Sequence, residues 1–179
     1  PRVRRLDAAP RGLPLADAAR ALGELASALD CLHRQPRPLA HGALAPARVR
    51  FRPRDGAAKL LGVQSPDRAP HAPVAYRSPE THDGAPPTPA TDVFGLATLA
   101  FEMLTGRAAF PEGPPRSAPE AWPSAHTIRA EVPDGVDAVL ARAWALDPTA
   151  RPASATGFVT ALTAALGLAT DAPTPAPEE

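Results

Sequence analysis

The segment from Thr91 to Thr105 constrains the fold more than any other part of the chain. Apolar residues are dense in it and fall on nearly every side of the helix that it predicts. A helix with this pattern is stable only when other elements bury it, so the segment predicts a central helix. Gly106 follows directly and is the residue type that most often ends helices. The other elements must therefore pack around this helix.

Three further helices are predicted over residues 15–34, 136–146 and 154–166. In the first of them, leucines recur at helical spacing and form one apolar stripe, which consists of Leu22, Leu25, Leu29 and Leu32. Single residues in these helices are also expected to be buried, namely Cys31, Trp144 and Phe158.

A small β-hairpin is predicted between the first helix and the central one. Val49 and Phe51 alternate with arginines, as in a half-buried strand, and Asp55-Gly56 is a turn signal before the apolar stretch 57–63. We expect this hairpin to pack on the helix before it. The rest is predicted to be irregular, with a basic entry that holds at most one short helix (1–14) and two proline-rich loops (64–89 and 111–123). The expected fold class is mainly α, with a small sheet of the α+β type.

A chain of 179 residues has room for one domain, which we place at 1–168, before a proline-rich acidic tail or linker at 169–179. The formal net charge is zero, so the overall balance indicates neither nucleic acid nor an anionic membrane as a partner. No apolar run reaches the ~20 residues that span a bilayer. With Cys31 as its only cysteine, the chain can form neither an internal disulfide nor a cysteine-based zinc site, which fits a cytoplasmic location. Because the chain begins with Pro1 rather than Met, we expect it to be a piece of a longer protein.

Five short segments share their order and approximate spacing with the motifs of one protein family. They are HGALAPARV (41–49), KLLGVQ (59–64), YRSPE (76–80), DVFGL followed by EMLTG (92–106), and DPTARP (147–152). In this order, over about residues 3–166, they resemble the C-terminal lobe of the bacterial eukaryotic-like serine/threonine protein kinases. The resemblance implies the kinase large lobe with a small β-hairpin. The N-lobe elements are absent, since no glycine-rich loop precedes the first motif.

The residues that stabilise this lobe in the family have counterparts here. The resemblance implies that Glu80 pairs with Arg151, and that loss of one partner would strand a buried charge. It also implies that Asp92 accepts backbone N–H groups from the catalytic loop; the alternative is that Asp92 is an ordinary helix N-cap. His41 corresponds to the catalytic-loop histidine, which packs in the core rather than titrating.

The residues that carry out phosphate transfer in the family are missing. Phosphoryl transfer uses a catalytic-loop aspartate, and it uses an asparagine and the D-F-G aspartate to hold magnesium. The family's aspartate, lysine, asparagine and D-F-G aspartate are replaced here by Ala43, Ala45, Arg48 and Gly62, respectively. A methyl group accepts no proton, and a guanidinium has no acceptor atom. The resemblance therefore implies that neither of the family's cofactors, ATP and magnesium, is bound, unless Asp67 supplies the missing carboxylate.

Several functional readings remain open from the sequence. The first is a pseudokinase module that binds protein partners, such as an active kinase or its substrates. The alternative is a divergent serine/threonine protein kinase, truncated of its N-lobe, in which Arg48 contacts a nucleotide phosphate directly. A third is a decaying fragment without a role.

Trp122 either packs beneath its loop or anchors a partner. The histidines lack the spacing of metal ligands, and those weighed were His33, His71, His82 and His126.

Overall fold

The computed structural model describes residues 4–5, 12–62, 72–117 and 119–168, so the tail predicted at 169–179 lies outside the described residues. The helices are α1 (Leu15–His33), α2 (Pro79–His82), α3 (Pro89–Thr105), α4 (Ala125–Ile128), α5 (Gly135–Ala143) and α6 (Ala155–Ala165). The strands are β1 (Arg4–Arg5), β2 (Val49–Phe51) and β3 (Ala58–Leu60), and short 3-10 turns are η2 (Pro46–Arg48), η3 (Val74–Tyr76) and η4 (Pro148–Ala150). The predicted fold class, mainly α with a small sheet, is confirmed.

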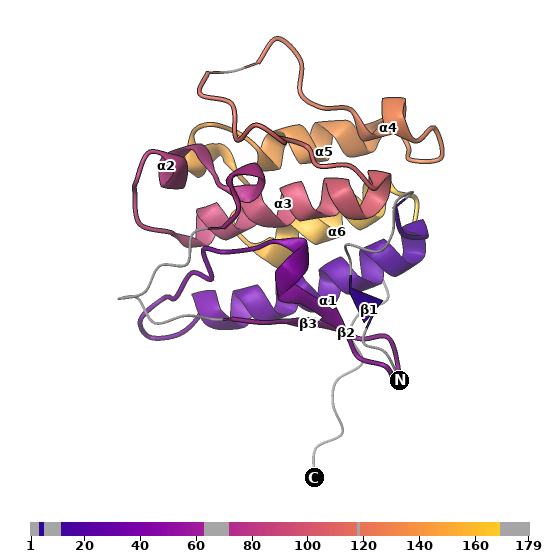
Figure 1. Ribbon diagram of the computed structural model, residues 1–179, viewed down its shortest axis with the longest axis horizontal. Helices are drawn as coiled ribbons and strands as arrows, with labels where there is room; N and C mark the ends of the chain where they lie inside the picture. Colours follow the sequence, from indigo (N-terminus) through magenta and orange to yellow (C-terminus); the bar gives the residue numbers. More distant parts are fainter. Residues whose placement is uncertain (1–3, 6–11, 63–71, 118, 169–179) are drawn as a thin grey trace.

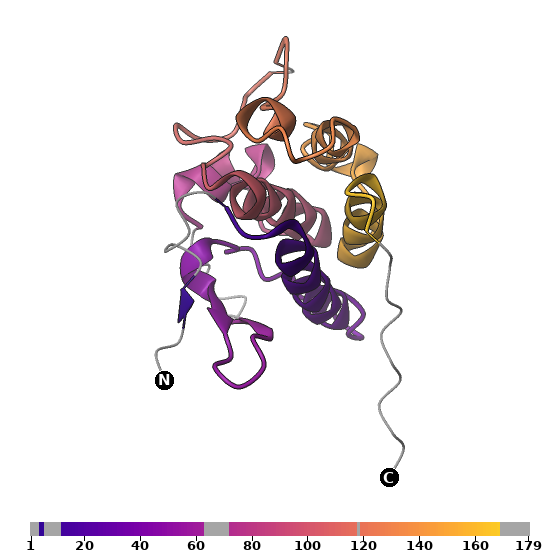
Figure 2. The same cartoon turned by 90° about the vertical axis from the view of Figure 1, so that its right-hand side faces the viewer.

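Helix α3 is the centre of the fold, as its apolar pattern predicted. Thr88 caps its first turn through a reciprocal pair of hydrogen bonds with Thr91, and Gly106 ends it in the left-handed conformation with φ 73°. Helices α1, α5 and α6 all contact α3, and they lie around it in two perpendicular views (Figures 1 and 2). The helix is buried over nearly its whole length.

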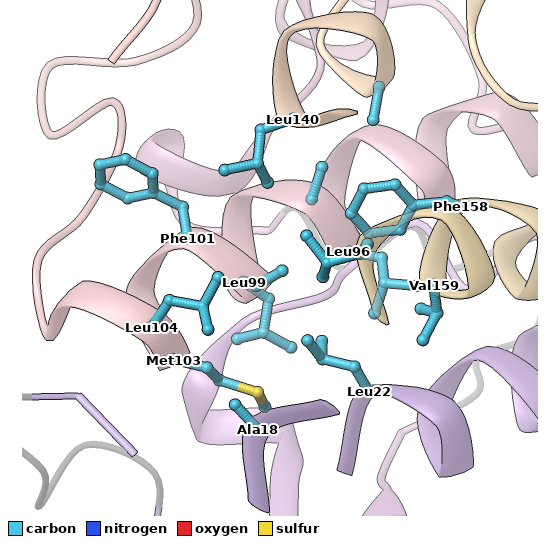
Figure 3. Packing of buried hydrophobic residues seen from close by; sticks show 14 of the residues in the cluster. Ala18, Leu22, Leu96, Leu99, Phe101, Met103, Leu104, Leu140, Phe158 and Val159 are labelled. Carbon is cyan, nitrogen blue, oxygen red and sulfur yellow. The ribbon is translucent and has the colours of Figure 1, made fainter. Parts of the chain in front are cut away.

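The core lies where these helices meet (Figure 3). Leu22 of α1, Leu96 and Leu99 of α3 and Phe158 of α6 are fully buried and point into one cluster. Trp144 is also fully buried, as predicted, and its indole N–H donates to the Thr98 hydroxyl at 3.1 Å. Burying side chains of this size contributes roughly 1.5–3 kcal/mol each, which makes this cluster the main source of stability.

Two single-residue predictions about burial have different outcomes. Cys31 is exposed, so the prediction that it is buried is wrong. The apolar stripe of α1 consists of leucines on the opposite side, which leaves this thiol facing solvent. Trp122 packs against the core beside Phe110 and Trp144, with ring centroids 6.2 and 6.0 Å away. The packing interpretation of Trp122 is therefore confirmed.

The predicted hairpin forms and is extended by a third strand. Strands β2 and β3 pair antiparallel with Val49 opposite Leu60 and Phe51 opposite Ala58. Strand β1 pairs antiparallel with β2, so the entry segment predicted to be irregular supplies an edge strand. Two residues are too few for a periodic pattern, which explains why the sequence did not reveal β1. The sheet packs on α1, whose Glu24 carboxylate accepts the Ala58 N–H.

The remaining differences concern short elements and helix ends. Helix α2 and η3 lie in the segment 64–89, which was predicted to be a loop, and α4 was not predicted. Each of them is four residues long or less, which is below the length at which hydrophobic periodicity is informative. Helix α5 ends at Ala143 rather than at residue 146, because the chain leaves the helix at Trp144. In the described part of the chain, the helices are too short or too polar to cross a bilayer.

Candidate functional site

Asp92 joins the first turn of α3 to the loop that begins at His41. Its side chain is 1% exposed and accepts the backbone N–H groups of His41 at 2.7 Å and Gly42 at 2.8 Å. The His33 Nε2 atom, at the end of α1, lies 2.8 Å from the same carboxylate. Thr88, not Asp92, is the helix cap, so the N-cap alternative is wrong. One carboxylate therefore fixes the loop to two helices.

His41 is buried in the core beneath this loop, with 2% of its surface exposed. Its Nε2–H donates to the Leu61 carbonyl at 3.1 Å, and its Nδ1 accepts the Ala43 N–H at 3.3 Å. These two contacts require the neutral imidazole. Burial lowers the pKa of His41 below its ordinary value, and the nearby cation of Arg48 lowers it further. The Leu61 carbonyl and the Asp92 carboxylate raise the pKa, but they do not outweigh burial. His41 therefore lies in the core, beneath the loop that Asp92 holds.

The lowered pKa of His41 predicts a pH dependence of stability. The unfolded chain binds a proton at this imidazole below pH about 6.5, whereas the folded chain resists it down to its lower pKa. The contribution of His41 is therefore fully present above pH about 6.5 and lost as the pH falls through the folded pKa. We expect urea unfolding to show a steeper loss of stability on acidification for the wild type than for His41→Gln. Parallel curves for the two proteins would contradict this prediction.

Glu80 and Arg151 form an ion pair between α2 and the start of the α6 segment. The two guanidinium nitrogens of Arg151 lie 2.7 and 2.8 Å from the two carboxylate oxygens of Glu80. The Arg151 side chain is 0% exposed and the Glu80 side chain 18%. This is the pairing that the resemblance implied. Burial alone would raise the pKa of the Glu80 carboxyl, but the hydrogen bonds from Arg151 outweigh burial and lower it.

Neighbouring groups form hydrogen bonds with the remaining polar atoms of Glu80 and Arg151. Arg151 also donates to the carbonyls of Ala145 at 2.9 Å and Ala90 at 3.0 Å, and its guanidinium lies 5.1 Å from the centre of the Phe94 ring. The Thr91 hydroxyl donates to Glu80 at 3.1 Å. A buried ion pair is tolerated when both partners find such additional bonds, so this one connects α2, α3 and η4 rigidly.

The four positions where the sequence departs from the kinase motifs lie around the loop that Asp92 holds. Ala43 and Ala45 are buried, with 1% and 2% exposure. Arg48 ends η2, and Gly62 follows β3 with φ 86°. A Cβ atom built on Gly62 would lie 2.3 Å from Nη1 of Arg48 and 3.2 Å from its Cζ. The guanidinium therefore occupies space that a side chain at position 62 would need.

These residues do not fit a magnesium ion. Magnesium is bound by carboxylate and other oxygen ligands, whereas the positions described above offer two methyl groups, a glycine and a cation. Among the described residues, no group of three or more His, Cys, Asp or Glu side chains is placed to hold a metal ion. Asp67, the possible replacement, and His71 lie outside the described residues.

Three further polar contacts were not expected from the sequence. Asp30 accepts the backbone N–H groups of Ala155 at 2.9 Å and Thr156 at 3.1 Å, and so fixes the start of α6. The Tyr76 hydroxyl donates to the Glu102 carboxylate, and burial, followed by this hydrogen bond, raises the pKa of Tyr76. The third is the contact between His33 and Asp92. All three contacts join residues that are far apart in the chain. The only signal in the sequence was that polar residues within apolar segments need hydrogen-bond partners when they are buried.

Comparisons with known proteins point to one family. No protein-family model matches the chain. The chain is 36% identical over 81 residues to serine/threonine-protein kinase PkaA of Streptomyces coelicolor, a match that covers 45% of the chain and 15% of the relative. It is 29% identical over 119 residues to serine/threonine-protein kinase A of Synechocystis, covering 61% of the chain and 22% of the relative. The chain thus spans less than a quarter of either relative.

Solved kinase domains share the fold over most of the chain. The PknI kinase domain of Mycobacterium tuberculosis has a TM-score of 0.69 and 27% identity, covering 89% of this chain and 59% of that one. The kinase PK-1 of Cydia pomonella granulovirus, at 17% identity and a TM-score of 0.65, shows the fold alone. Since a little over half of a kinase domain is matched, and the matched motifs run from the catalytic loop onward, the chain is related to the serine/threonine protein kinases and has the fold of their C-terminal lobe.

Proposed function

We propose that this lobe is a pseudokinase module, which acts by binding protein partners rather than by transferring phosphate. One observation carries the proposal: the Arg48 guanidinium lies against Gly62, at the two positions where the kinase motifs place magnesium ligands. Ala43, where the motifs place the catalytic base, has no group that accepts a proton. The lobe would thus bind neither magnesium nor the magnesium complex of ATP.

The intact scaffold supports a binding role over simple decay. Asp92 and the Glu80–Arg151 pair make two sets of buried polar contacts, and neither set needs the missing catalytic groups. A sequence that drifts without a role has no reason to retain a buried ion pair, whose loss on either side is costly. We propose an active kinase or its substrates as the partners, by analogy with the kinase domains whose fold the lobe shares.

The proposal predicts a cooperative thermal melt that magnesium–ATP does not shift. A ligand that binds only the folded state raises the melting temperature, so an absent shift reports absent binding. The measurement is the melting temperature of this chain with and without magnesium–ATP, with an active kinase domain as the positive control. A melt without cooperativity would instead favour the decayed fragment.

A phosphotransfer assay tests the enzyme alternative directly. We expect this chain to transfer no γ-phosphate from ATP to a protein substrate. Turnover that disappears in an Asp67→Asn variant would overturn the pseudokinase proposal, because it would show that another carboxylate has replaced the missing ones.

A further inference from the structure

The hairpin of strands β2 and β3 carries a strong local excess of positive charge. Residues 50–59 contain four cationic side chains and one carboxylate, which gives a formal charge of +3 in a chain whose formal net charge is zero. The cationic residues, which we call the basic hairpin, are Arg50, Arg52, Arg54 and Lys59. The turn between the two strands lies at the edge of the fold in both views (Figures 1 and 2). This edge therefore has a positive potential, although the whole chain is neutral.

The strand register places several of these cations beside one another. Arg50 of β2 lies directly opposite Lys59 of β3, and Arg5 of β1 holds the register position on the other side of Arg50. Successive side chains of a strand point to opposite faces, and the neighbours Val49 and Ala58 are buried. Arg50 and Lys59 therefore lie on the outer face of the sheet. Because like charges directly opposite each other destabilise an antiparallel pair, the stability of the sheet does not explain this arrangement.

Carboxylates of the chain neutralise little of this charge. Arg52 pairs with Asp55 at 2.6 Å, and both side chains are about half exposed. Arg50 donates to two backbone carbonyls, which carry no net charge. Arg54 and Lys59 are exposed, and neither makes an ion pair or a side-chain hydrogen bond with another residue of the described part of the chain. Three of the four cations of the basic hairpin thus have no carboxylate partner among the described residues.

The acidic groups that α1 places beside the hairpin are already bonded. Glu24 accepts the Ala58 N–H and lies 3.5 Å from a guanidinium nitrogen of Arg20. Arg20 also lies 3.7 Å from Asp17, and it donates to the Gly56 carbonyl in the hairpin turn at 3.2 Å. Because the charge of Arg20 cancels that of one carboxylate, this helix leaves the positive excess of the hairpin only partly balanced.

We propose that the basic hairpin is a docking surface for an extended acidic segment of a partner protein. Alternate side chains of an extended segment point the same way and lie about 6.6 Å apart, which is also the repeat that separates Arg50 from Arg52. Acidic residues at every second position can therefore each meet a cation. Guanidinium groups match carboxylates in a planar geometry with two hydrogen bonds. The inference rests on the proposed function, because it names the surface and the chemistry through which the module would bind its partner.

Two observations favour a protein segment over a nucleic acid. Proteins bind single strands through aromatic side chains that stack on the bases. Within residues 50–59 the only aromatic side chain, Phe51, packs against the core, on the side opposite to Arg50. Proteins that bind a duplex make roughly 6–10 phosphate contacts, which is more than the cations of this short hairpin supply. An acidic peptide needs neither stacking nor so many contacts.

Fluorescence anisotropy tests the inference on the whole chain, after a cooperative melt has shown that the chain is folded. The probe is a labelled peptide of alternating glutamate and serine, and the control is the same peptide with lysine in place of glutamate. We expect the acidic peptide to bind saturably at low ionic strength and to lose affinity as salt is added, because salt screens the attraction between exposed charges. The lysine peptide should not bind.

Paired substitutions show whether the basic hairpin is the binding group. Arg54→Gln combined with Lys59→Gln removes two cations that lack a carboxylate partner, and is expected to weaken binding of the acidic peptide about tenfold, because two ion pairs with the peptide are lost. Arg37→Gln combined with Arg142→Gln removes an equal charge at exposed positions outside the hairpin, and is expected to leave binding nearly unchanged. Both double variants should melt like the wild type, since all four side chains are exposed.

Four results would overturn the inference. The first is a folded chain that does not bind the acidic peptide. The second is an equal loss of affinity in the two double variants, which would indicate a diffuse attraction. The third is tighter binding of an oligothymidylate, or of vesicles that contain phosphatidylserine, which would indicate a partner of another class. The fourth is binding that appears only after Glu178→Gln and Glu179→Gln, which would show that the chain's own tail is the occupant.

The proposed function is tested separately from this docking surface. Phosphate transfer by the chain would contradict the proposed function, whatever the result with the acidic peptide. A folded chain that binds neither the acidic peptide nor magnesium–ATP would contradict the docking surface alone.

Discussion

Replacing Arg151 by alanine is expected to lower the free energy of unfolding by about 3–5 kcal/mol. The substitution leaves the Glu80 carboxylate, 18% exposed, without the cation that pairs with both of its oxygens. It also removes the donors that satisfy the Ala90 and Ala145 carbonyls and the cation that lies over the Phe94 ring. Urea unfolding followed by circular dichroism measures the loss. Because a whole domain is stable by only about 5–15 kcal/mol, a loss at the upper end of this range would leave part of the variant unfolded at room temperature.

A double-mutant cycle separates the ion pair from general damage to the fold. Glu80→Ala should be strongly destabilising by itself, while the double variant should lose much less than the sum of the two single losses, because neither charge is then stranded. Arg142→Ala, at an exposed arginine of α5, is the matched control and should change stability by less than about 0.5 kcal/mol. Strictly additive losses of stability in the two single variants would show that Glu80 and Arg151 act independently, and would contradict the prediction.

The parts of the fold that the sequence predicted are those with a repeating local signal. The leucines of α1 recur at helical spacing, and α3 is apolar throughout, so both helices could be placed to within a few residues. The β2–β3 pairing followed from alternation and from one turn signal at Asp55-Gly56. Strand β1 and helix α4 carry no such signal, because two to four residues cover only about one period, so no pattern can repeat. Their positions depend on pairing and packing with distant segments.

In the candidate site, too, the sequence predicted the local motifs but not the contacts between distant residues. The motifs indicated that Arg48 and Gly62 each depart from the kinase pattern, but they did not indicate that the two residues touch. The contacts of Asp92 with His33 and of Asp30 with the start of α6 join positions 59 and more than 100 residues apart. Contacts of this kind follow from the packed fold, so a single sequence does not contain a pattern that predicts them.

The distribution of retained and lost residues has a physical explanation. The polar groups that remain, including Asp92 and the Glu80–Arg151 pair, are bonded within the chain and therefore contribute to folding without any ligand. The four positions that differ from the family's motifs are those that the family uses for phosphate transfer or for holding magnesium. Under the proposed function no magnesium ion would balance two carboxylates at this site, and such like charges would repel each other.

Replacing Asp92 by alanine is expected to be the other strongly destabilising change, with a loss of roughly 3 kcal/mol or more, because each stranded buried donor costs about 1–3 kcal/mol. Without the carboxylate, the backbone N–H groups of His41 and Gly42 have no acceptor, and the His33 ring loses its partner. Hydrogen exchange should show faster exchange at residues 41 and 42, while amides in the middle of α6 stay protected until global unfolding.

Thr88→Ala is the control variant with which the stability loss of Asp92→Ala is compared. Thr88 is the cap of α3, and loss of a cap typically costs about 1 kcal/mol. If Asp92 served only the helix terminus, the two variants would be destabilised to a similar extent. A clearly larger loss for Asp92→Ala, partly recovered in Asp92→Asn because the amide retains one acceptor oxygen, would identify Asp92 as the residue that holds the loop. Equal losses would mean that packing alone holds the loop that begins at His41, and that the hydrogen bonds of Asp92 add little to its stability.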